Sequence, residues 1–368
     1  MATVTFYPLG NADCCLMRLG SGKILVFDYA DMRDRDDDED KRIALKESFL
    51  EDIGWPDRKE VDVLSITHGD IDHVKGIPEA FWLDHAEKYQ DDERVKIKEL
   101  WVPAALIVEE GAEDDTRIIR QEARHRFLNK KGIRVFSRPE RLKEWLKTQG
   151  RKIEDYQHLI TDAGQLVPGW TLDADGVELF VHSPFAERDG DKILDRNENC
   201  LVMHATIRVG GHDTRFLITA DSVSEEWQRM VRSTRRHKND HRLAWDIFKL
   251  PHHCSYLSMA EEKGKTKTAP TEEFEWLLNQ GAERSVMVST SSEIPSETTD
   301  QPPHVETYRR YKDTANALDA ELIVTMENPS KKKPKRTIIS LDANGPTLKK
   351  EAISAAIAIT TSTSPRMG

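Results

Sequence analysis

The feature that most constrains this chain is a dense group of histidines and aspartates at the end of an apolar segment. Residues 61–66 form an apolar run of strand length, and His68, Asp70, Asp72 and His73 follow it directly. Alternate side chains of an extended segment share a face, so His68, Asp70 and Asp72 can converge while His73 opens the next element. A polar loop is the simpler alternative, but polar loops rarely combine imidazoles and carboxylates at this spacing. The segment therefore predicts a metal site.

Short strand-like runs alternate with helix-like stretches over most of the 368 residues, which is the pattern of an α/β protein. We expect one domain over residues 1–345, elaborated at about 82–175, and a weakly ordered tail at 346–368. The expected helices cover residues 43–53, 224–235, 272–279 and 305–318. The expected strands cover residues 4–7, 16–19, 23–27, 61–66, 99–102, 133–136, 178–181, 200–209, 215–220, 247–250, 285–289, 321–326 and 336–341.

The charge of the chain limits its partners. The net charge is −11, which argues against a broad nucleic-acid surface, because neutralising phosphates needs clustered lysine and arginine. Two basic clusters nevertheless occur, at residues 232–242 and 331–336, although such runs are more often solvated surface than binding patches.

The sequence also predicts a cytoplasmic protein without membrane contact. The N-terminus lacks the pattern of a signal peptide, and no stretch approaches the roughly 18 apolar residues of a membrane span. The four cysteines form no CxxC pair, so we expect reduced, buried thiols.

Two further places downstream offer metal ligands. Asp221 ends an apolar strand, where it can bridge two cations or cap the helix that follows, and both roles stay open. His252 and His253 follow the strand at 247–250, and consecutive side chains there point in opposite directions. We expect only one of the two histidines to bind metal and the other to contact substrate or support a ligand.

The His68–His73 pattern resembles the second motif of the metallo-β-lactamase superfamily, whose commoner form has histidine in place of Asp70. With aspartate there, it resembles the branch typified by the soluble domain of ComEC-type DNA-uptake proteins. Two departures stand where glycine is usual, at Ala220 and Cys254. The segments that carry the rest of the resemblance are residues 9–13, 24–28, 197–202, 216–221 and 250–255.

The resemblance implies a four-layer αββα fold and suggests further site residues. For the ligand of the third motif, His182 and Asn199 compete, because the register of the branch falls on Asn199. His304 precedes a predicted helix and resembles a histidine loop of the branch, with substrate phosphate contact or leaving-group protonation as its role; an exposed loop histidine is the alternative. Asp72 joins His304 as a catalytic candidate, and the candidates for substrate contact are Asp28, Ser255, Arg235 and Arg236.

The ligand types indicate two divalent ions, manganese or zinc, with magnesium as a further option, because Asp70 raises the oxygen content of the site. Two such ions activate a bridging hydroxide for in-line displacement. The expected function is hydrolysis of a phosphodiester in DNA or RNA, and the free-standing form suggests a protein partner in a defence-type complex. The alternatives are hydrolysis of a small molecule, such as a cyclic nucleotide, lactone or thioester, or a non-catalytic regulatory module of the same fold.

Overall fold

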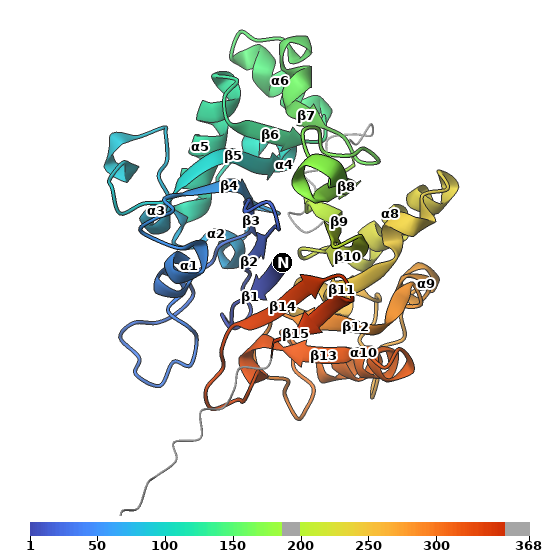
Figure 1. Ribbon diagram of the computed structural model, residues 1–368. Helices are drawn as coiled ribbons and strands as arrows, with labels where there is room; N and C mark the ends of the chain where they lie inside the picture. Colours follow the sequence, from blue (N-terminus) through green and yellow to red (C-terminus); the bar gives the residue numbers. More distant parts are fainter. Residues whose placement is uncertain (186–198, 350–368) are drawn as a thin grey trace, which may run out of the picture.

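The computed structural model describes residues 1–185 and 199–349, and its strands form two sheets (Figure 1). The first sheet has nine strands in the order β15-β14-β1-β2-β3-β4-β5-β6-β7. Its strands are β1 (Ala2–Phe6), β2 (Cys15–Arg18), β3 (Ile24–Phe27), β4 (Glu60–Ser65), β5 (Lys96–Pro103), β6 (Ile133–Phe136), β7 (Ile160–Thr161), β14 (Thr337–Asp342) and β15 (Gly345–Leu348). The segment at 82–175 thus contributes three strands to this sheet.

The second sheet has six strands in the order β13-β12-β11-β10-β9-β8. They are β8 (Val177–Ser183), β9 (Val202–Val209), β10 (His212–Ile218), β11 (Trp245–Lys249), β12 (Gly281–Ser289) and β13 (Glu321–Val324). All the strands expected from the sequence are present within a few residues of their expected ends. Strand β7 was missed because it has only two residues, and β15 because its sequence, GPTL, begins with glycine and proline, which are depleted in strands.

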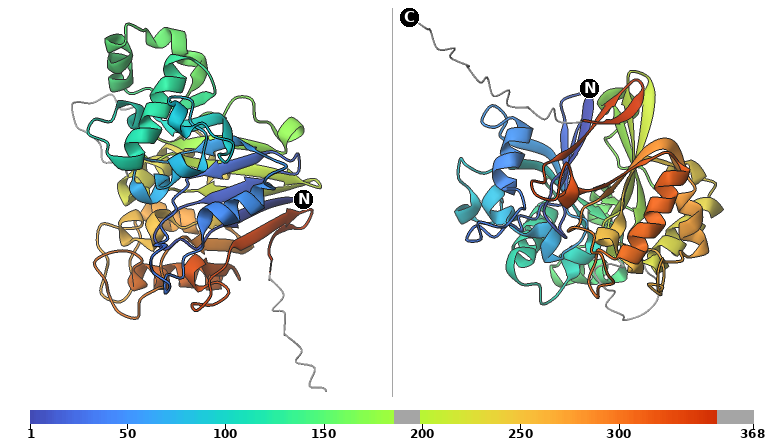
Figure 2. Two further views of the ribbon diagram at one scale, coloured as in Figure 1. Left: turned by 90° about the vertical axis from the view of Figure 1, so that its left-hand side faces the viewer. Right: turned by 90° about the horizontal axis from the view of Figure 1, so that it is seen from below.

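The two sheets pack face to face, and helices cover both outer faces (Figure 2). Alternate residues of one strand serve different layers: Leu25 and Phe27 of β3 join the core between the sheets, whereas Ile24 and Val26 pack towards the helices. The first sheet is covered by α1 (Leu45–Ile53), α3 (Ile77–Ala80), α4 (Ala104–Val108), α5 (Asp114–Leu128) and α6 (Glu140–Thr148). The second is covered by α8 (Ser224–Arg236), α9 (Glu272–Leu278) and α10 (Val305–Ala317).

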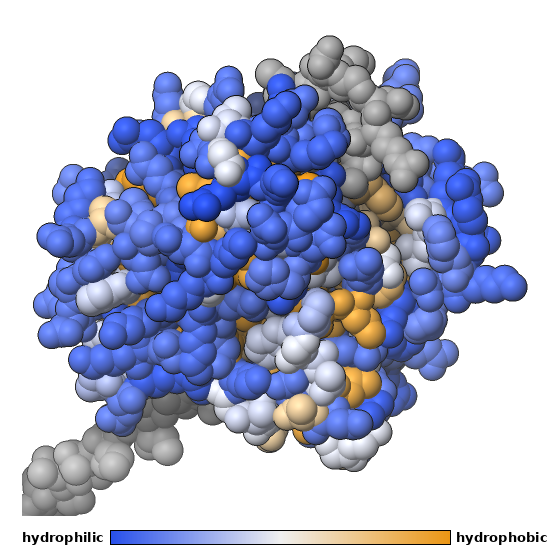
Figure 3. All heavy atoms as spheres, turned by 90° about the horizontal axis from the view of Figure 1, so that it is seen from above, coloured by the Kyte–Doolittle hydropathy of each residue, from blue (hydrophilic) through white to orange (hydrophobic). Residues whose placement is uncertain are grey.

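This four-layer αββα arrangement is the fold class expected from the sequence, and that prediction is confirmed. Hydrophilic residues dominate the face of the molecule in Figure 3, in keeping with a composition that is 32% charged. Among the described helices, none has the length and apolar character needed to cross a membrane.

The candidate site residues follow the carboxyl ends of parallel strands. Within the first sheet β3 to β7 run parallel, and within the second β10 to β13 do. Loops that leave the carboxyl ends of parallel strands meet at one edge, where open sheets usually place their chemistry. His68 follows β4, Asp221 follows β10 and His253 follows β11, so the packing of the two sheets brings these loops together.

Helix α5 supports the loop after β4. The hydroxyl of Thr116, near its N-terminus, donates a hydrogen bond of 2.7 Å to the carbonyl oxygen of Gly69. Farther along the helix, the buried carboxylate of Glu122 pairs with Arg126 at 2.5 Å and accepts hydrogen bonds from the backbone N–H groups of Asp84 and His85. Burial raises the pKa of Glu122, but the hydrogen bond with His85 and the charge of Arg126 lower it to about 2.

Glu122→Ala should destabilise the protein by about 3–5 kcal/mol, because it removes the buried carboxylate that pairs with the buried Arg126 and leaves only the half-exposed Asp84, at 3.3 Å, as an anionic partner. The folded-state pKa of Glu122 lies below its ordinary value, so its contribution is present at neutral pH and is lost as the pH falls towards about 2. Urea unfolding at pH 7 and at about pH 3 measures both effects. The difference in stability between parent and variant should shrink at the lower pH, and an equal difference at both would contradict the prediction. Glu140→Ala, at an exposed position on α6, is the control.

Candidate metal centre

Four buried side chains from four separate segments converge between the sheets. Asp13, His73, Asp221 and His253 each offer a ligand atom, and these atoms lie within 4.8 Å of one another. Asp221 is central, since its Oδ1 is 3.4 Å from His73 Nε2 and its Oδ2 is 3.2 Å from His253 Nε2. The arrangement supports the bridging role considered for Asp221.

The converging atoms lack hydrogen-bond partners among the described residues. They are His68 Nε2, His73 Nε2, His253 Nε2, Asp221 Oδ1 and Asp13 Oδ1. Leaving buried polar atoms unpaired costs free energy, and native proteins leave few of them so. A divalent cation supplies the missing partner for nitrogen and oxygen donors together, so these residues fit a metal ion.

Asp28 orients His73. Its φ of 57° lies in the left-handed region, and its carboxylate accepts hydrogen bonds of 2.7 Å from both the N–H and the hydroxyl of Thr67. Oδ2 lies 2.8 Å from His73 Nδ1, which leaves Nε2 facing Asp221. A carboxylate behind a ligating imidazole fixes its tautomer and ring orientation. Asp28 is only 2% exposed and its carboxylate is engaged by Thr67 and His73, so this geometry supports a role behind the ligand and does not support the predicted substrate contact.

His253, not His252, lies inside the cluster. The Nδ1 atom of His253 is 2.7 Å from the carbonyl oxygen of Thr290, so its Nε2 is directed at Asp221 and at Asp72 Oδ2, which is 3.4 Å away. His252 Nε2 lies 4.0 Å from Asp221 Oδ2, and its side chain is partly exposed at 17%. This difference matches the expectation that only one of the pair faces the metal.

The backbone around these histidines is left-handed. His252, His253 and Cys254 have φ values of 50°, 52° and 66°, and Ala220, just before Asp221, has 51°. Residues with a Cβ adopt this region at a cost of roughly 1–2 kcal/mol each. Ala220 and Cys254 are the positions at which the resembled family usually has glycine, and the φ values supply the physical reason for that preference.

Asp13, a member of the cluster, and Lys249, its partner, were not predicted as site residues from the sequence. Lys249 Nζ lies 2.6 Å from Asp13 Oδ2, and both residues are almost fully buried, at 3% and 2% exposed. Burial lowers the pKa of Lys249, but the charges of Asp13, Asp221 and Asp28 outweigh burial and raise it, so the lysine is a fixed cation beneath the cluster. The signal was a lone lysine within a buried apolar strand, which needs a buried anion as its partner.

The carboxylates and imidazoles of the cluster stabilise each other's charged forms. Burial raises the pKa of Asp221, but His253 and His73 bring it well below its ordinary range. Burial lowers the pKa of His253, yet Asp221 and Asp72 raise it to about 10, and the pKa of His73 is raised in the same way by Asp221 and Asp28. The cluster is thus polarised strongly enough to hold cations, whether protons or metal.

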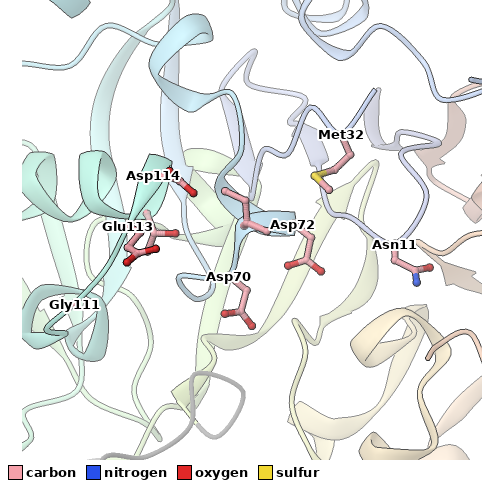
Figure 4. Close-up of a pocket in the computed structure, with 9 residues that line it drawn as sticks. Asn11, Met32, Asp70, Asp72, Gly111, Glu113 and Asp114 are labelled. Carbon is pink, nitrogen blue, oxygen red and sulfur yellow. The ribbon is translucent and has the colours of Figure 1, made fainter. Parts of the chain in front are cut away.

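The other members of the His68–His73 motif lie beside the cluster, with His68 buried and Asp70 and Asp72 closer to solvent. His68 Nε2 is 3.3 Å from Asp70 Oδ2, and the side chain of Asp70 is 32% exposed. Asp70 and Asp72 line an open hollow of about 500 Å³, between Glu113 and Asp114 on one side and Met32 and Asn11 on the other (Figure 4). Within the motif, His73 thus contacts Asp221 and Asp72 contacts His253, while His68 adjoins His73, and Asp70 and Asp72 open the site to solvent.

The two candidates for the third-motif ligand differ in their surroundings. His182 is buried with Nε2 at 2.8 Å from the carbonyl oxygen of Arg242 and Nδ1 at 3.2 Å from the hydroxyl of Thr234, so neither ring nitrogen is available to a metal. Asn199 lies two residues before Leu201, whose N–H donates to the carbonyl oxygen of Thr67, next to His68. Asn199 stays the candidate; residues 197 and 198 of its motif lie outside the described residues.

His304 and Ser255 lie beside the loop that carries His253. His304 is buried. Its Nδ1 accepts a hydrogen bond of 3.3 Å from the backbone N–H of Tyr256, and its backbone N–H donates to the carbonyl oxygen of Cys254. The exposed-loop alternative for His304 is therefore wrong. Ser255 is 0% exposed and its hydroxyl accepts from the N–H of Leu257, which gives it a structural role in place of the predicted substrate contact.

Arg235 and Arg236 lie at the far end of α8 from Asp221. A helix of 13 residues is roughly 20 Å long, so the structure does not bring them to the cluster. The guanidinium group of Arg235 stacks 4.6 Å from the ring of Trp276. Arg232 and Arg242 of the same basic cluster pair with Glu273 at 2.6 Å and Glu178 at 2.5 Å. The predicted substrate contacts of Arg235 and Arg236 are not supported by this geometry.

The fold and the site together define the class of protein: a four-layer αββα protein with a buried aspartate and histidine cluster suited to a divalent metal. No family model matches the sequence, and no curated protein matches it.

Several solved structures are similar to most of this chain at low sequence identity. A protein from Parabacteroides distasonis, provisionally named a metal-dependent hydrolase, is 9% identical, with 87% of this chain and 92% of that chain covered and a TM-score of 0.37. A diphosphatase of the PhnP family is 11% identical, with coverage of 88% and 95% and a TM-score of 0.35. A class B3 di-zinc metallo-β-lactamase from an Alaskan soil metagenome is 9% identical, with coverage of 86% and 91% and a TM-score of 0.29. Because identity and TM-score are low for each, the function proposed below rests on the residues of this chain.

Asp221→Ala and His253→Ala should each abolish stoichiometric metal binding, because they remove central donors and leave their neighbours' buried charges unpaired. The effect is measured as the metal content of each protein by inductively coupled plasma mass spectrometry, after dialysis against limiting zinc or manganese. The exposed His237→Ala is the matched control and should keep the parent's metal content. Equal metal content in all four proteins would contradict the assignment.

Proposed function

We propose that this chain is a metal-dependent hydrolase that cleaves phosphodiester bonds. The observation that carries the proposal is the group of buried, unpartnered donor atoms of His68, His73, His253 and Asp221 beside an open hollow of about 500 Å³. Buried donors alone would suit a structural metal, whose site is closed. A connection to solvent through Asp70 and Asp72 gives substrate and water access, as in a catalytic site.

The charges favour two divalent ions. Five carboxylates belong to the site or contact it, those of Asp13, Asp28, Asp70, Asp72 and Asp221, and Lys249 is the buried cation among them. With neutral imidazoles, this set is four charges negative, which two divalent cations balance. The mixture of imidazole and carboxylate donors suits zinc or manganese, with magnesium as a weaker fit.

Metal ions at this site would polarise a phosphoryl oxygen and lower the pKa of bound water. The residues of the chain supply the rest. Asp28 and the carbonyl oxygen of Thr290 hold the imidazoles of His73 and His253 in one orientation. Asp72 lines the hollow as well as approaching His253, which suits it to hold a nucleophilic water. His304 is buried, with Nδ1 accepting from the backbone N–H of Tyr256 and Nε2 3.4 Å from the carbonyl oxygen of Asp300, so this geometry does not support its predicted role in protonating a leaving group.

DNA or RNA as the substrate, and a protein partner in a defence-type complex, are proposals that rest on the resemblance stated above. Hydrolysis of a small molecule is a second candidate, favoured by the volume of the hollow, which is in the range of small-ligand sites.

With added manganese or zinc, the protein should hydrolyse bis-(p-nitrophenyl) phosphate, and Asp72→Asn should lower kcat/KM by at least about 100-fold, because it removes a charged group at the metal. Release of p-nitrophenolate measures the rate. The control is Asp173→Asn, at a side chain that is fully exposed. Bound metal without hydrolysis of phosphodiesters, lactones or thioesters would reject the proposal and favour a regulatory module.

A further inference from the structure

The hollow beside the candidate metal centre is lined by acid. Asp70, Asp72, Glu113 and Asp114 contribute four carboxylates to its wall, and its described lining includes no lysine, arginine or histidine. Glu113 and Asp114 stand at the start of α5 and are exposed, and no ion pair among the described residues involves either of them. We call Glu113 and Asp114 the acidic lip (Figure 4).

A second hollow of about 460 Å³ continues the first, since the two share Asn11 and Met32. The acidic loop at residues 34–40 borders it, together with Lys41 and Arg42. Both cations are already paired, Lys41 with Glu293 at 3.0 Å and Arg42 with Asp40 at 2.6 Å. Among the described residues of the two linings, Glu113 and Asp114 on one side and Asp37 and Glu39 on the other therefore present negative charge that no ion pair neutralises.

Bound metal does not remove this charge. Two divalent ions would neutralise the carboxylates of the centre, but Glu113 and Asp114 would keep their charges at the rim. Charges lining a cleft are focused by its low-dielectric walls, so like-charged substrates are depleted there. A polyanion that places one phosphodiester at the metals would bring its neighbouring phosphates against the lip.

We infer that the acidic lip determines specificity: the site takes short phosphodiesters whose groups on either side of the scissile bond carry no further negative charge, and it discriminates against polynucleotides. This inference rests on the proposed phosphodiesterase function. The volume of the first hollow fits a ligand of that size.

The test compares kcat/KM for a labelled 20-nucleotide DNA strand with kcat/KM for bis-(p-nitrophenyl) phosphate, at low and moderate salt. In the parent, kcat/KM for the DNA strand should be low relative to kcat/KM for bis-(p-nitrophenyl) phosphate. This ratio should rise with salt, since screening weakens the repulsion between the acidic lip and the DNA phosphates. In E113K/D114K the ratio should rise by roughly tenfold or more at low salt. E113Q/D114N removes the negative charges without adding positive ones and should give a smaller rise in the ratio. It tests the inference independently in case the lysine variant does not fold.

The matched control is E154K/D155K, which makes the same change of charge at an exposed Glu-Asp pair on the short helix η2 (Ile153–Leu159), next to β7 at the far edge of the first sheet. It should leave the ratio at the parent's value. Equal ratios in the lip and control variants, or DNA cleavage by the parent that falls with salt, would overturn the inference and leave the phosphodiesterase proposal intact. Hydrolysis of neither substrate by metal-loaded parent would overturn the proposed function itself.

Discussion

The site depends on the contacts of one buried carboxylate, that of Asp221, with the imidazoles of His73 and His253. His73 reaches it from the loop after β4 of the first sheet, and His253 from the loop after β11 of the second. A charge buried at this depth is tolerated only when it is compensated. The face-to-face packing of the sheets supplies the compensation, because it brings donors from distant parts of the chain around one carboxylate. A divalent metal would complete the set, since donor atoms of His73, His253 and Asp221 are left without hydrogen bonds among the described residues.

A second layer of interactions holds these donors in place. Asp28 and the carbonyl oxygen of Thr290 each engage one nitrogen of an imidazole and leave the other for the cluster. The left-handed backbone at Ala220 and at His252–Cys254 is strained for residues with a Cβ, and such strain is retained when the surrounding contacts over-determine the conformation. The ammonium group of Lys249 pairs with Asp13, which lowers the electrostatic cost of burying several carboxylates together.

The surroundings of the site shape what can reach it. On α8, Arg232 is paired with Glu273 and Arg235 is stacked on Trp276, towards the end of the helix remote from Asp221. The rim of the hollow is acidic instead. Local electrostatics thus favour small phosphodiesters over the polyanions expected from the resemblance, although both reactions would use the same centre.

The sequence by itself determined the α/β class, most strand positions and the motif from His68 to His73, because alternation of apolar residues and ligand spacing are local properties of the chain. The four-layer αββα arrangement was expected only from the resemblance that these motifs carry. It also placed Asp221 and the pair His252 and His253 after apolar strands. Only the tertiary structure decided that His253 faces the cluster, that His182 does not, and that Asp28 supports His73. It alone revealed Asp13 with Lys249, and Glu113 with Asp114 at the rim. These outcomes depend on which distant segments the two sheets bring together and on the burial that results, and neither is encoded in spacing along the chain.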